Sequence, residues 1–206
     1  YLPGVKNEFV WDPACGDGRF LVKIVERIIQ YSNPSELANN LSKVYGFDID
    51  IDAINKAKSQ INNLIKSFNI VVEWNIVVKN SLYKITNATD NMLDEYDFIV
   101  GNPPYIRIQH LKQKERKYLQ DNYRFCRSGS TDIYIAFYDF ALDSLSKDGI
   151  CGFITPNTFF NTDTAIDLRQ YFESSMNLIQ ITNFGHFQLF ENVTTYSAIV
   201  IFDQNS

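Results

Sequence analysis

The stretch that decides the fold is FVWDPACGDGRFL, residues 9–21. Its first three residues are apolar and predict a short buried strand. The glycines at positions 16 and 18 allow a sharp turn and a close approach of the backbone to a ligand. An apolar face that begins at Phe20 then predicts a helix over about residues 19–30. A strand, a glycine loop and a helix in this order are typical of an α/β nucleotide-binding unit.

The glycine loop does not match the dinucleotide-binding fingerprint. A third glycine is missing, and the carboxylates of Asp12 and Asp17 would repel a pyrophosphate. An acidic glycine loop instead suits a ligand with a cationic end, such as the ammonium and sulfonium groups of S-adenosylmethionine. The alternative that the loop is only a structural turn between strand and helix stays open.

Two further strand ends carry polar side chains. A strand from Val44 ends at Asp48 and Asp50, and strand material over residues 76–78 leads to Asn80. A carboxylate at the tip of the second strand commonly accepts hydrogen bonds from ribose hydroxyls in such folds. Asp48 is the better placed candidate, and Asp50 is alternatively the cap of the next helix. Asn80 is a candidate for the edge of an adenine ring.

Strand and helix patterns continue to alternate along the chain. Strands are expected at 98–100, 150–155 and 178–184, helices at 132–145 and 164–174, and a turn at 147–149. A hairpin is expected to close the chain, from 187–190 to 196–202. This order predicts a doubly wound, mostly parallel α/β sheet with a C-terminal antiparallel hairpin. Ligands of such sheets bind at the carboxyl ends of the strands.

The stretch YDFIVGNPPY, residues 96–105, combines a buried strand with an unusual ending. Two prolines fix two φ angles and remove two N–H donors, while their carbonyl acceptors remain. Asn102 adds a side-chain oxygen and Tyr105 adds a flat aromatic face. Acceptors beside an aromatic face suit a planar ligand with an exposed amino group. The alternative is a tight turn after a strand.

Composition sets the broad class of the protein. A chain of 206 residues with 45% hydrophobic content fits one globular domain, and its net charge of −5 does not indicate a nucleic-acid binder. Residues 107–127, however, hold seven Lys or Arg against two acidic residues. This basic segment is either a phosphate-facing surface or a solvated helix face.

The cysteines and the apolar runs indicate the compartment. Three widely spaced cysteines predict free thiols in a reducing compartment and argue against a metal site. No apolar run reaches the length of a membrane span and no signal peptide is recognisable. We therefore expect a cytoplasmic protein that does not contact a membrane.

Taken together, the motifs DPACGxGxFL at 12–21 and NPPY at 102–105 resemble the N6-adenine-specific DNA methyltransferases of restriction-modification systems. The likeness covers nearly the whole chain, with the cofactor motif ahead of the catalytic one. It implies that residues 1–206 are the methyltransferase catalytic domain of a longer protein, truncated at both ends and without the target recognition region. It implies double-stranded DNA as a partner, and leaves open the oligomeric state and whether a nuclease region shares the full-length chain.

The resemblance also assigns roles. S-adenosylmethionine would be the cofactor, with its methionyl part at the glycine loop and its ribose at Asp48. Asn80 stands where the family usually has Asp, which puts cofactor affinity in question. Asn102 and the Pro103 carbonyl would hold the target amino group, while the face of Tyr105 stacks on the flipped base. The implied catalytic residues are Asn102, Pro103, Pro104, Tyr105 and Phe190, and the implied cofactor-binding residues are Asp12, Pro13, Ala14, Cys15, Gly16, Gly18, Phe20, Asp48, Ile49, Asn80, Ser81 and Leu82.

Two rival functions remain. The same acceptor motif serves related enzymes that methylate RNA bases or a protein glutamine. A methyltransferase-like DNA-binding module without catalysis is the second rival, and the amide at Asn80 is its only support. Methylation of cytosine at C5 is disfavoured, because no cysteine nucleophile stands in the catalytic motif.

Overall fold

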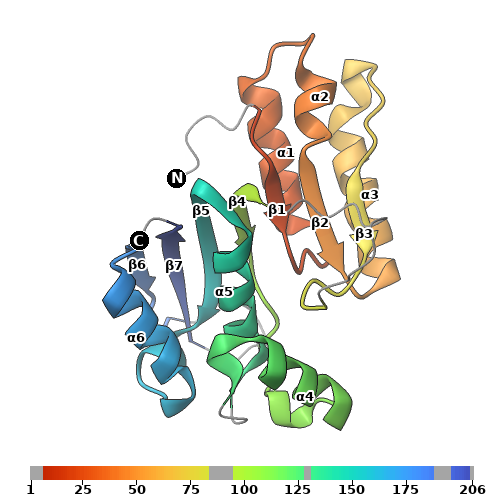
Figure 1. Ribbon diagram of the computed structural model, residues 1–206. Coiled ribbons are helices and arrows are strands. Elements are labelled where there is room, and N and C mark those ends of the chain that lie inside the picture. The colour runs from red at the N-terminus through yellow and green to blue at the C-terminus, as the bar shows by residue number, and fades with distance from the viewer. Residues whose placement is uncertain (1–6, 84–94, 128–130, 188–195, 205–206) are drawn as a thin grey trace. The chain divides into compact units, whose positions relative to one another are not determined.

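The structure is a computed structural model that describes residues 7–83, 95–127, 131–187 and 196–204 (Figure 1). The chain forms two compact units, Tyr1–Gly101 and Asn102–Ser206. Each unit has its own paired strands, helices and buried apolar side chains. The candidate cofactor residues fall in the first unit, and the candidate catalytic residues fall in the second.

The first unit is a parallel sheet. Its elements are β1 (Val10–Asp12), α1 (Arg19–Tyr31), α2 (Leu37–Leu41), β2 (Val44–Asp48), α3 (Ile51–Ile65), β3 (Asn75–Val78) and β4 (Tyr96–Gly101). The strands lie in the order β3-β2-β1-β4, and β1 pairs in parallel with both β2 and β4. Asp12 lies beside Gly46, and Asp48 lies beside Val78. The carboxyl ends of β1, β2 and β3 therefore share one edge of the sheet.

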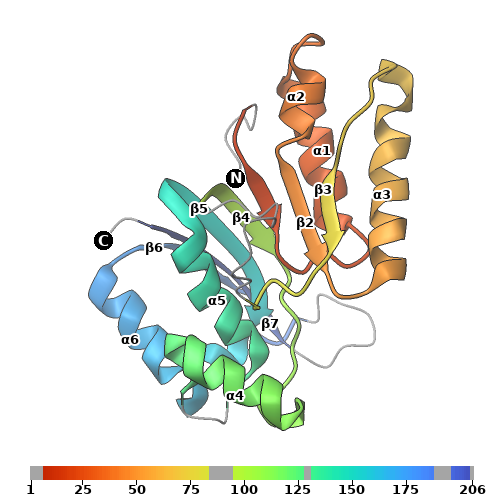
Figure 2. The same cartoon turned by 45° about the vertical axis from the view of Figure 1, so that its right-hand side comes forward.

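Two apolar stripes hold the long helices of this unit in place. The buried side chains recur every three or four residues, as expected for one face of a helix. Figures 1 and 2 show α1 and α3 running alongside β1, β2 and β3. The predicted helix at 19–30 is confirmed and extends by one residue to Tyr31. The buried residues are Leu21, Ile24, Val25 and Ile28 in α1, and Ile54, Ala57, Ile61 and Ile65 in α3.

Trp11 is the centre of the aromatic core beneath the glycine loop. Its ring stacks on Tyr96 of β4 with 4.7 Å between centroids, and meets the edge of Phe47 of β2 at 5.3 Å. All three side chains are almost fully buried. Each such pair contributes about 0.5–1.5 kcal/mol beyond the burial of its area. The packing fixes the strand that ends at Asp12, and so positions the start of the loop.

The second unit contains an antiparallel sheet. Its elements are α4 (Gln113–Asn122), α5 (Ile133–Ser144), β5 (Leu145–Pro156), α6 (Ile166–Ser175), β6 (Leu178–Asn183) and β7 (Ser197–Asp203). β7 lies between β5 and β6 and pairs with both in antiparallel fashion. The ring of Tyr138 in α5 contacts Phe202 at 5.6 Å and Phe172 of α6 at 6.0 Å. These ring contacts place α5 and α6 in one aromatic core with β7. Figure 2 shows the two helices alongside the sheet.

Two local predictions have different outcomes. The last strand, β7, pairs with β5 and β6; of residues 187–190, expected as the first strand of the closing hairpin, the structure describes only Phe187, which lies in no strand and is 69% exposed. Residues 147–149, expected as a turn, lie within β5, because the backbone becomes extended at Leu145 directly after α5. Across the described residues, no helix has both the length and the apolar character that a membrane crossing requires.

Candidate active site

The two glycines of the loop between β1 and α1 have different surroundings. Both have positive φ, +51° at Gly16 and +89° at Gly18. A Cβ atom on Gly18 would lie 2.8 Å from the Cβ of Ala57, so this glycine lets the loop pack against α3. A Cβ on Gly16 would meet nothing within 4 Å. Gly16 therefore borders open space where a ligand can approach the backbone.

Asp48 links the tip of β2 to this loop. Its Oδ2 accepts a hydrogen bond from the Gly16 amide at 2.8 Å, and its Oδ1 accepts one from the Asp50 amide at 3.0 Å. A carboxylate oxygen has room for a second donor, so both oxygens can still accept from hydroxyl groups. Asp50 accepts instead from the amides of Asp52 and Ala53, at 2.8 and 3.4 Å, and caps α3. The alternative role of Asp50 as a helix cap is confirmed, whereas the ribose contact expected at Asp48 stays a prediction.

The loop after β3 is tied to the glycine loop. The Ser81 hydroxyl donates to the Pro13 carbonyl at 2.6 Å, and the Leu82 amide donates to Asn80 Oδ1 at 3.0 Å. The side chains of Ser81 and Leu82 are buried, so they support the loop from within. Ile49 is 73% exposed and offers an apolar surface next to Asp48. An apolar surface beside a hydroxyl acceptor suits a nucleoside.

Among the described carboxyl groups of the first unit, Asp12 has the largest pKa shift. Its side chain is buried, and burial raises its pKa to about 8, although the Ala14 amide, 3.2 Å away, donates to it. A Cβ on Gly101 would lie only 2.9 Å from Asp12 Oδ1, so the glycine at the end of β4 makes room for this carboxyl group. A buried carboxyl group beside an open glycine loop favours a cationic ligand, because a positive charge would offset its desolvation.

Asp17, the second acid of the loop, already has cationic neighbours. Its carboxylate lies 3.0 Å from Lys56 Nζ and 3.4 Å from Arg19 Nε. Gln60 also donates to the Asp17 carbonyl at 2.6 Å. Asp17 therefore fastens the loop to α3, whereas Asp48 accepts from the Gly16 amide and Asp12 accepts from the Ala14 amide. Among the other predicted residues, Cys15 is buried, and Ala14 and Phe20 are half-buried.

In the second unit, the NPPY segment contains a short hydrogen bond. The Tyr105 hydroxyl donates to Asn102 Oδ1 at 2.5 Å and lies 3.2 Å from the Ile154 carbonyl. Burial raises the pKa of Tyr105 to about 12, so its hydroxyl stays protonated. The edge of its ring meets Tyr134 with 6.3 Å between centroids. Sequence reasoning assigned only the ring face of Tyr105, and no pattern in the sequence signals the bond from its hydroxyl.

Two other sequence predictions have different outcomes. Phe190, expected as a second aromatic against the target base, lies outside the described residues. All three cysteines are free and buried, and burial raises the pKa of each thiol. Since the thiolate is the nucleophilic form of cysteine, none of the three is suited to covalent catalysis.

The basic segment is only partly available to a ligand. Arg124 Nε donates to the buried Asp139 at 2.5 Å and Nη2 donates to Asp143 at 2.8 Å, so this arginine anchors the segment to α5. The apolar side of the segment is buried through Leu119, Tyr123 and Phe125. The exposed basic residues of the segment are Arg107, Lys112, Lys114, Lys117, Arg124 and Arg127.

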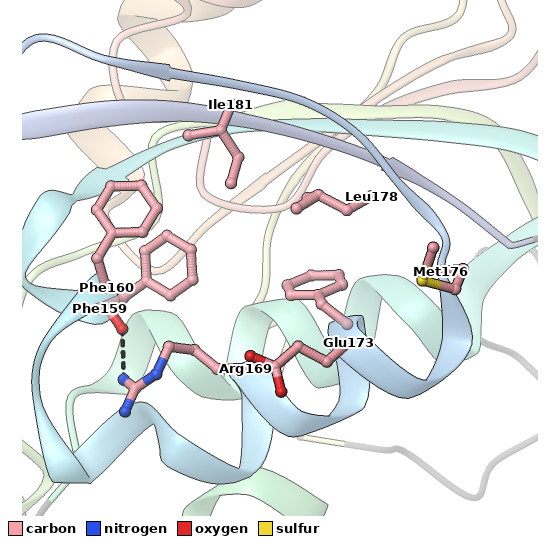
Figure 3. A pocket seen from close by; sticks show the side chains of 8 residues that line it. Phe159, Phe160, Arg169, Glu173, Met176, Leu178 and Ile181 are labelled. Atoms are coloured by element: carbon pink, nitrogen blue, oxygen red, sulfur yellow. Dashed lines mark hydrogen bonds between the residues drawn. The ribbon is translucent and has the colours of Figure 1, made fainter.

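A separate pocket of about 360 Å³ lies between α6 and β6 in the second unit (Figure 3). Phe159, Phe160 and Phe172 line it together with aliphatic side chains. Arg169 at its border donates to the Phe159 carbonyl at 2.6 Å. None of the predicted site residues that the structure describes lines this pocket. It is therefore distinct from the residues expected to hold cofactor or substrate.

Comparison with known proteins matches most of the chain to one family. A sequence model of the family described as Eco57I restriction-modification methylase matches residues 22–190. RM.Eco57I of Escherichia coli, a type II restriction enzyme and methyltransferase, is 30% identical over 147 residues. This match covers 70% of the present chain and 14% of that protein. The chain thus spans about a seventh of the length of this relative.

Solved structures show the same fold. A protein from Listeria monocytogenes that is described as a class I S-adenosylmethionine-dependent methyltransferase superposes with a TM-score of 0.68 at 16% identity, covering 98% of this chain and 55% of that one. The Type ISP restriction-modification enzyme LlaGI, solved with a DNA substrate mimic, gives 0.73 at 18% identity, covering 99% and 21%. The predicted fold class, a doubly wound and mostly parallel sheet with antiparallel C-terminal strands, is confirmed.

Proposed function

Because the chain belongs to the Eco57I restriction-modification methylase family, we propose that it transfers a methyl group from S-adenosylmethionine to the N6 amino group of a flipped adenine in double-stranded DNA. The family supports a methyltransferase of a restriction-modification system. The adenine target and base flipping are further steps, argued from the residues below. In this proposal residues 1–206 are the catalytic domain of a longer protein.

S-adenosylmethionine is the cofactor that the family and the fold indicate. When bound, it supplies an electrophilic methyl group on a positively charged sulfur. The first unit fits such a ligand, since Gly16 borders open space and Asp12 is a buried carboxyl group beside the loop. We assign the ribose hydroxyls to Asp48 and the adenine ring to Ile49 and Asn80. The other cofactor-binding residues predicted from the sequence lie in the loops after β1 and β3, and we assign these two loops to the same cofactor.

The observation that carries the proposed chemistry is the acceptor at Asn102, whose Oδ1 accepts a hydrogen bond from the Tyr105 hydroxyl. The adenine amino nitrogen is a poor nucleophile, because its lone pair is delocalised into the ring. Acceptors at Asn102 Oδ1 and the Pro103 carbonyl would bind its two hydrogens and favour a localised lone pair. As positive charge develops on the nitrogen, the same acceptors stabilise it, which is the reverse of an oxyanion hole.

The buried cysteines favour amino methylation over cytosine C5 methylation. The C5 reaction requires a thiolate that attacks the base, whereas burial raises the pKa of every thiol in this chain. Direct transfer to an amino group requires no covalent intermediate. The site then needs only acceptors and correct positioning, which the NPPY segment supplies.

Access to an adenine in duplex DNA requires base flipping. Stacking on Tyr105 is worth about 1–3 kcal/mol and would offset part of an unstacking cost of a few kcal/mol. The exposed basic residues of α4 and its flanks would contact phosphates. The structure of LlaGI with a DNA substrate mimic supports DNA as the partner. RM.Eco57I, which is both a restriction enzyme and a methyltransferase, supports a nuclease region in the full-length protein.

The test is methyl transfer by the Asn102→Ala variant of the full-length protein. Loss of one of two acceptors should lower turnover by about 10²–10³-fold, by analogy with loss of one oxyanion-hole donor. Affinity for S-adenosylmethionine, measured by calorimetry, should stay at the parent value, because Asn102 is not among the proposed cofactor residues. Transfer at the parent rate would contradict the assignment.

The product distinguishes the rival functions. Digestion of methylated duplex DNA followed by mass spectrometry should yield N6-methyladenine. Methylation of RNA or of a glutamine-containing peptide in place of DNA would favour the first rival. A protein that binds DNA but gives no calorimetric signal with S-adenosylmethionine would be the non-catalytic module.

A further inference from the structure

The bond between Tyr105 and Asn102 joins the two ends of a stiff segment. The donor and the acceptor are three residues apart, and both residues between them are prolines with restricted φ. The separation of 2.5 Å is at the short end for a bond between a hydroxyl group and an oxygen acceptor. The amide of Asn102 is therefore held by a neighbour that itself has little freedom to move.

The direction of this bond determines which face of the amide is available. The single hydrogen of the Tyr105 hydroxyl can go to Asn102 Oδ1 at 2.5 Å or to the Ile154 carbonyl at 3.2 Å, and the Ser197 hydroxyl is a further hydrogen-bonding neighbour. Donation to Oδ1 orients the amide with its oxygen toward the aromatic ring. It occupies one lone pair of Oδ1 and leaves the second available to another donor. The raised pKa of Tyr105 is consistent with a hydroxyl that remains a donor throughout the neutral range.

We propose that the Tyr105 hydroxyl is a positioning group, which holds the Asn102 amide so that Oδ1 faces the amino group to be methylated. This inference rests on the proposed function and adds a role for Tyr105 besides stacking. Without the hydroxyl, the amide can turn by half a rotation and present Nδ2, a donor that would oppose the amino hydrogens. The hydroxyl thus acts through Asn102 and does not itself need to touch the reacting atoms.

The Tyr105→Phe variant tests the positioning role, because it retains the aromatic face. Single-turnover methyl transfer by the full-length protein should slow by about 3- to 10-fold, the effect of one neutral hydrogen bond. Base flipping, followed by 2-aminopurine fluorescence at the target position, should be unchanged. Cofactor affinity should also keep its parent value. If the hydroxyl positions Asn102, only the methyl-transfer step should be slower. If the variant instead damages the stacking surface, base flipping should also be weaker.

A matched control removes a different hydroxyl of the same unit. Tyr138 bonds the Thr155 hydroxyl at 2.9 Å and is fully buried. Tyr138→Phe should lower the melting temperature without a specific loss of transfer in the folded protein. If Tyr138→Phe slowed transfer as much as Tyr105→Phe, the effect would come from general loosening of the unit, and the positioning role would be refuted.

A double-mutant cycle separates this inference from the proposed function. If the hydroxyl acts only through Asn102, then Tyr105→Phe should have no added effect in the Asn102→Ala background. An equal effect in both backgrounds, or a Tyr105→Phe variant as fast as the parent, would overturn the positioning role while the large Asn102→Ala loss upholds the adenine site. An Asn102→Ala variant at the parent rate would overturn both.

Discussion

Gly16 and Gly18 form a matched pair that tests the cofactor loop. Both have a left-handed backbone, but their surroundings differ. An alanine methyl at Gly18 would lie 2.8 Å from the Cβ and 3.0 Å from the Cα of Ala57. The same methyl at Gly16 would project into space with no atom within 4 Å. The two Gly→Ala variants therefore separate a packing role from a ligand-approach role.

The magnitudes follow from these surroundings. A non-glycine residue in the left-handed region costs about 1–2 kcal/mol, and both variants incur this cost. Gly18→Ala also forces a methyl group against the backbone of α3, and such overpacking adds about 1–3 kcal/mol. We expect the free energy of unfolding to fall by about 2–5 kcal/mol in Gly18→Ala but by about 1–2 kcal/mol in Gly16→Ala.

Cofactor affinity should respond most specifically at Gly16. A methyl group that occupies the space of the bound ligand costs about 1–3 kcal/mol, which is about a 5- to 150-fold loss of affinity. Urea unfolding measures the stabilities, and calorimetric titration with S-adenosylmethionine measures the affinity of Gly16→Ala. Equal losses of stability in the two variants, or parent affinity in Gly16→Ala, would refute the reasoning.

Three further predictions concern charged residues. Asp48→Ala should weaken S-adenosylmethionine binding far more than Asp50→Ala, which should mainly cost the α3 cap about 0.5–2 kcal/mol; equal calorimetric affinities would contradict this. Burial in the folded state raises the pKa of Asp12 from 3.8 to about 8. Between these two pH values, the folded protein therefore binds more protons than the unfolded protein. The free energy of unfolding of the cofactor-free protein should therefore fall as pH rises from about 4 to about 8. Urea unfolding of the Asp12→Asn variant should show a smaller decrease over the same pH range. A parent-like pH profile in that variant would show that Asp12 is not responsible. When the exposed lysines of the basic segment are changed to Gln, the slope of DNA affinity against salt concentration should become shallower by about 0.9 for each phosphate that a lysine no longer neutralises. An unchanged slope would make the segment a solvated helix; these lysines are Lys112, Lys114 and Lys117.

The sequence by itself determined the features that depend on local pattern. The apolar periodicity of α1 placed its start at Arg19, and a strand followed by glycines predicted the loop before it. The acids at the ends of β1 and β2 could be predicted to lie at the ligand-binding edge of the sheet, because ligands of such folds bind at the carboxyl ends of the strands. The NPPY motif identified a stiff acceptor segment from the chemistry of proline alone.

Only the tertiary structure decided how those residues divide their roles. Gly18 rather than Gly16 packs on Ala57, and Asp17 is paired with Lys56, although neither partner is near in sequence. β6 is the partner of the last strand, and Arg124 is engaged by Asp139. Each of these outcomes depends on contacts between residues far apart in the chain, which local periodicity does not encode. The hydroxyl of Tyr105 is a local exception: its partner Asn102 is three residues away, but its second contact, with the Ile154 carbonyl, comes from a distant part of the chain.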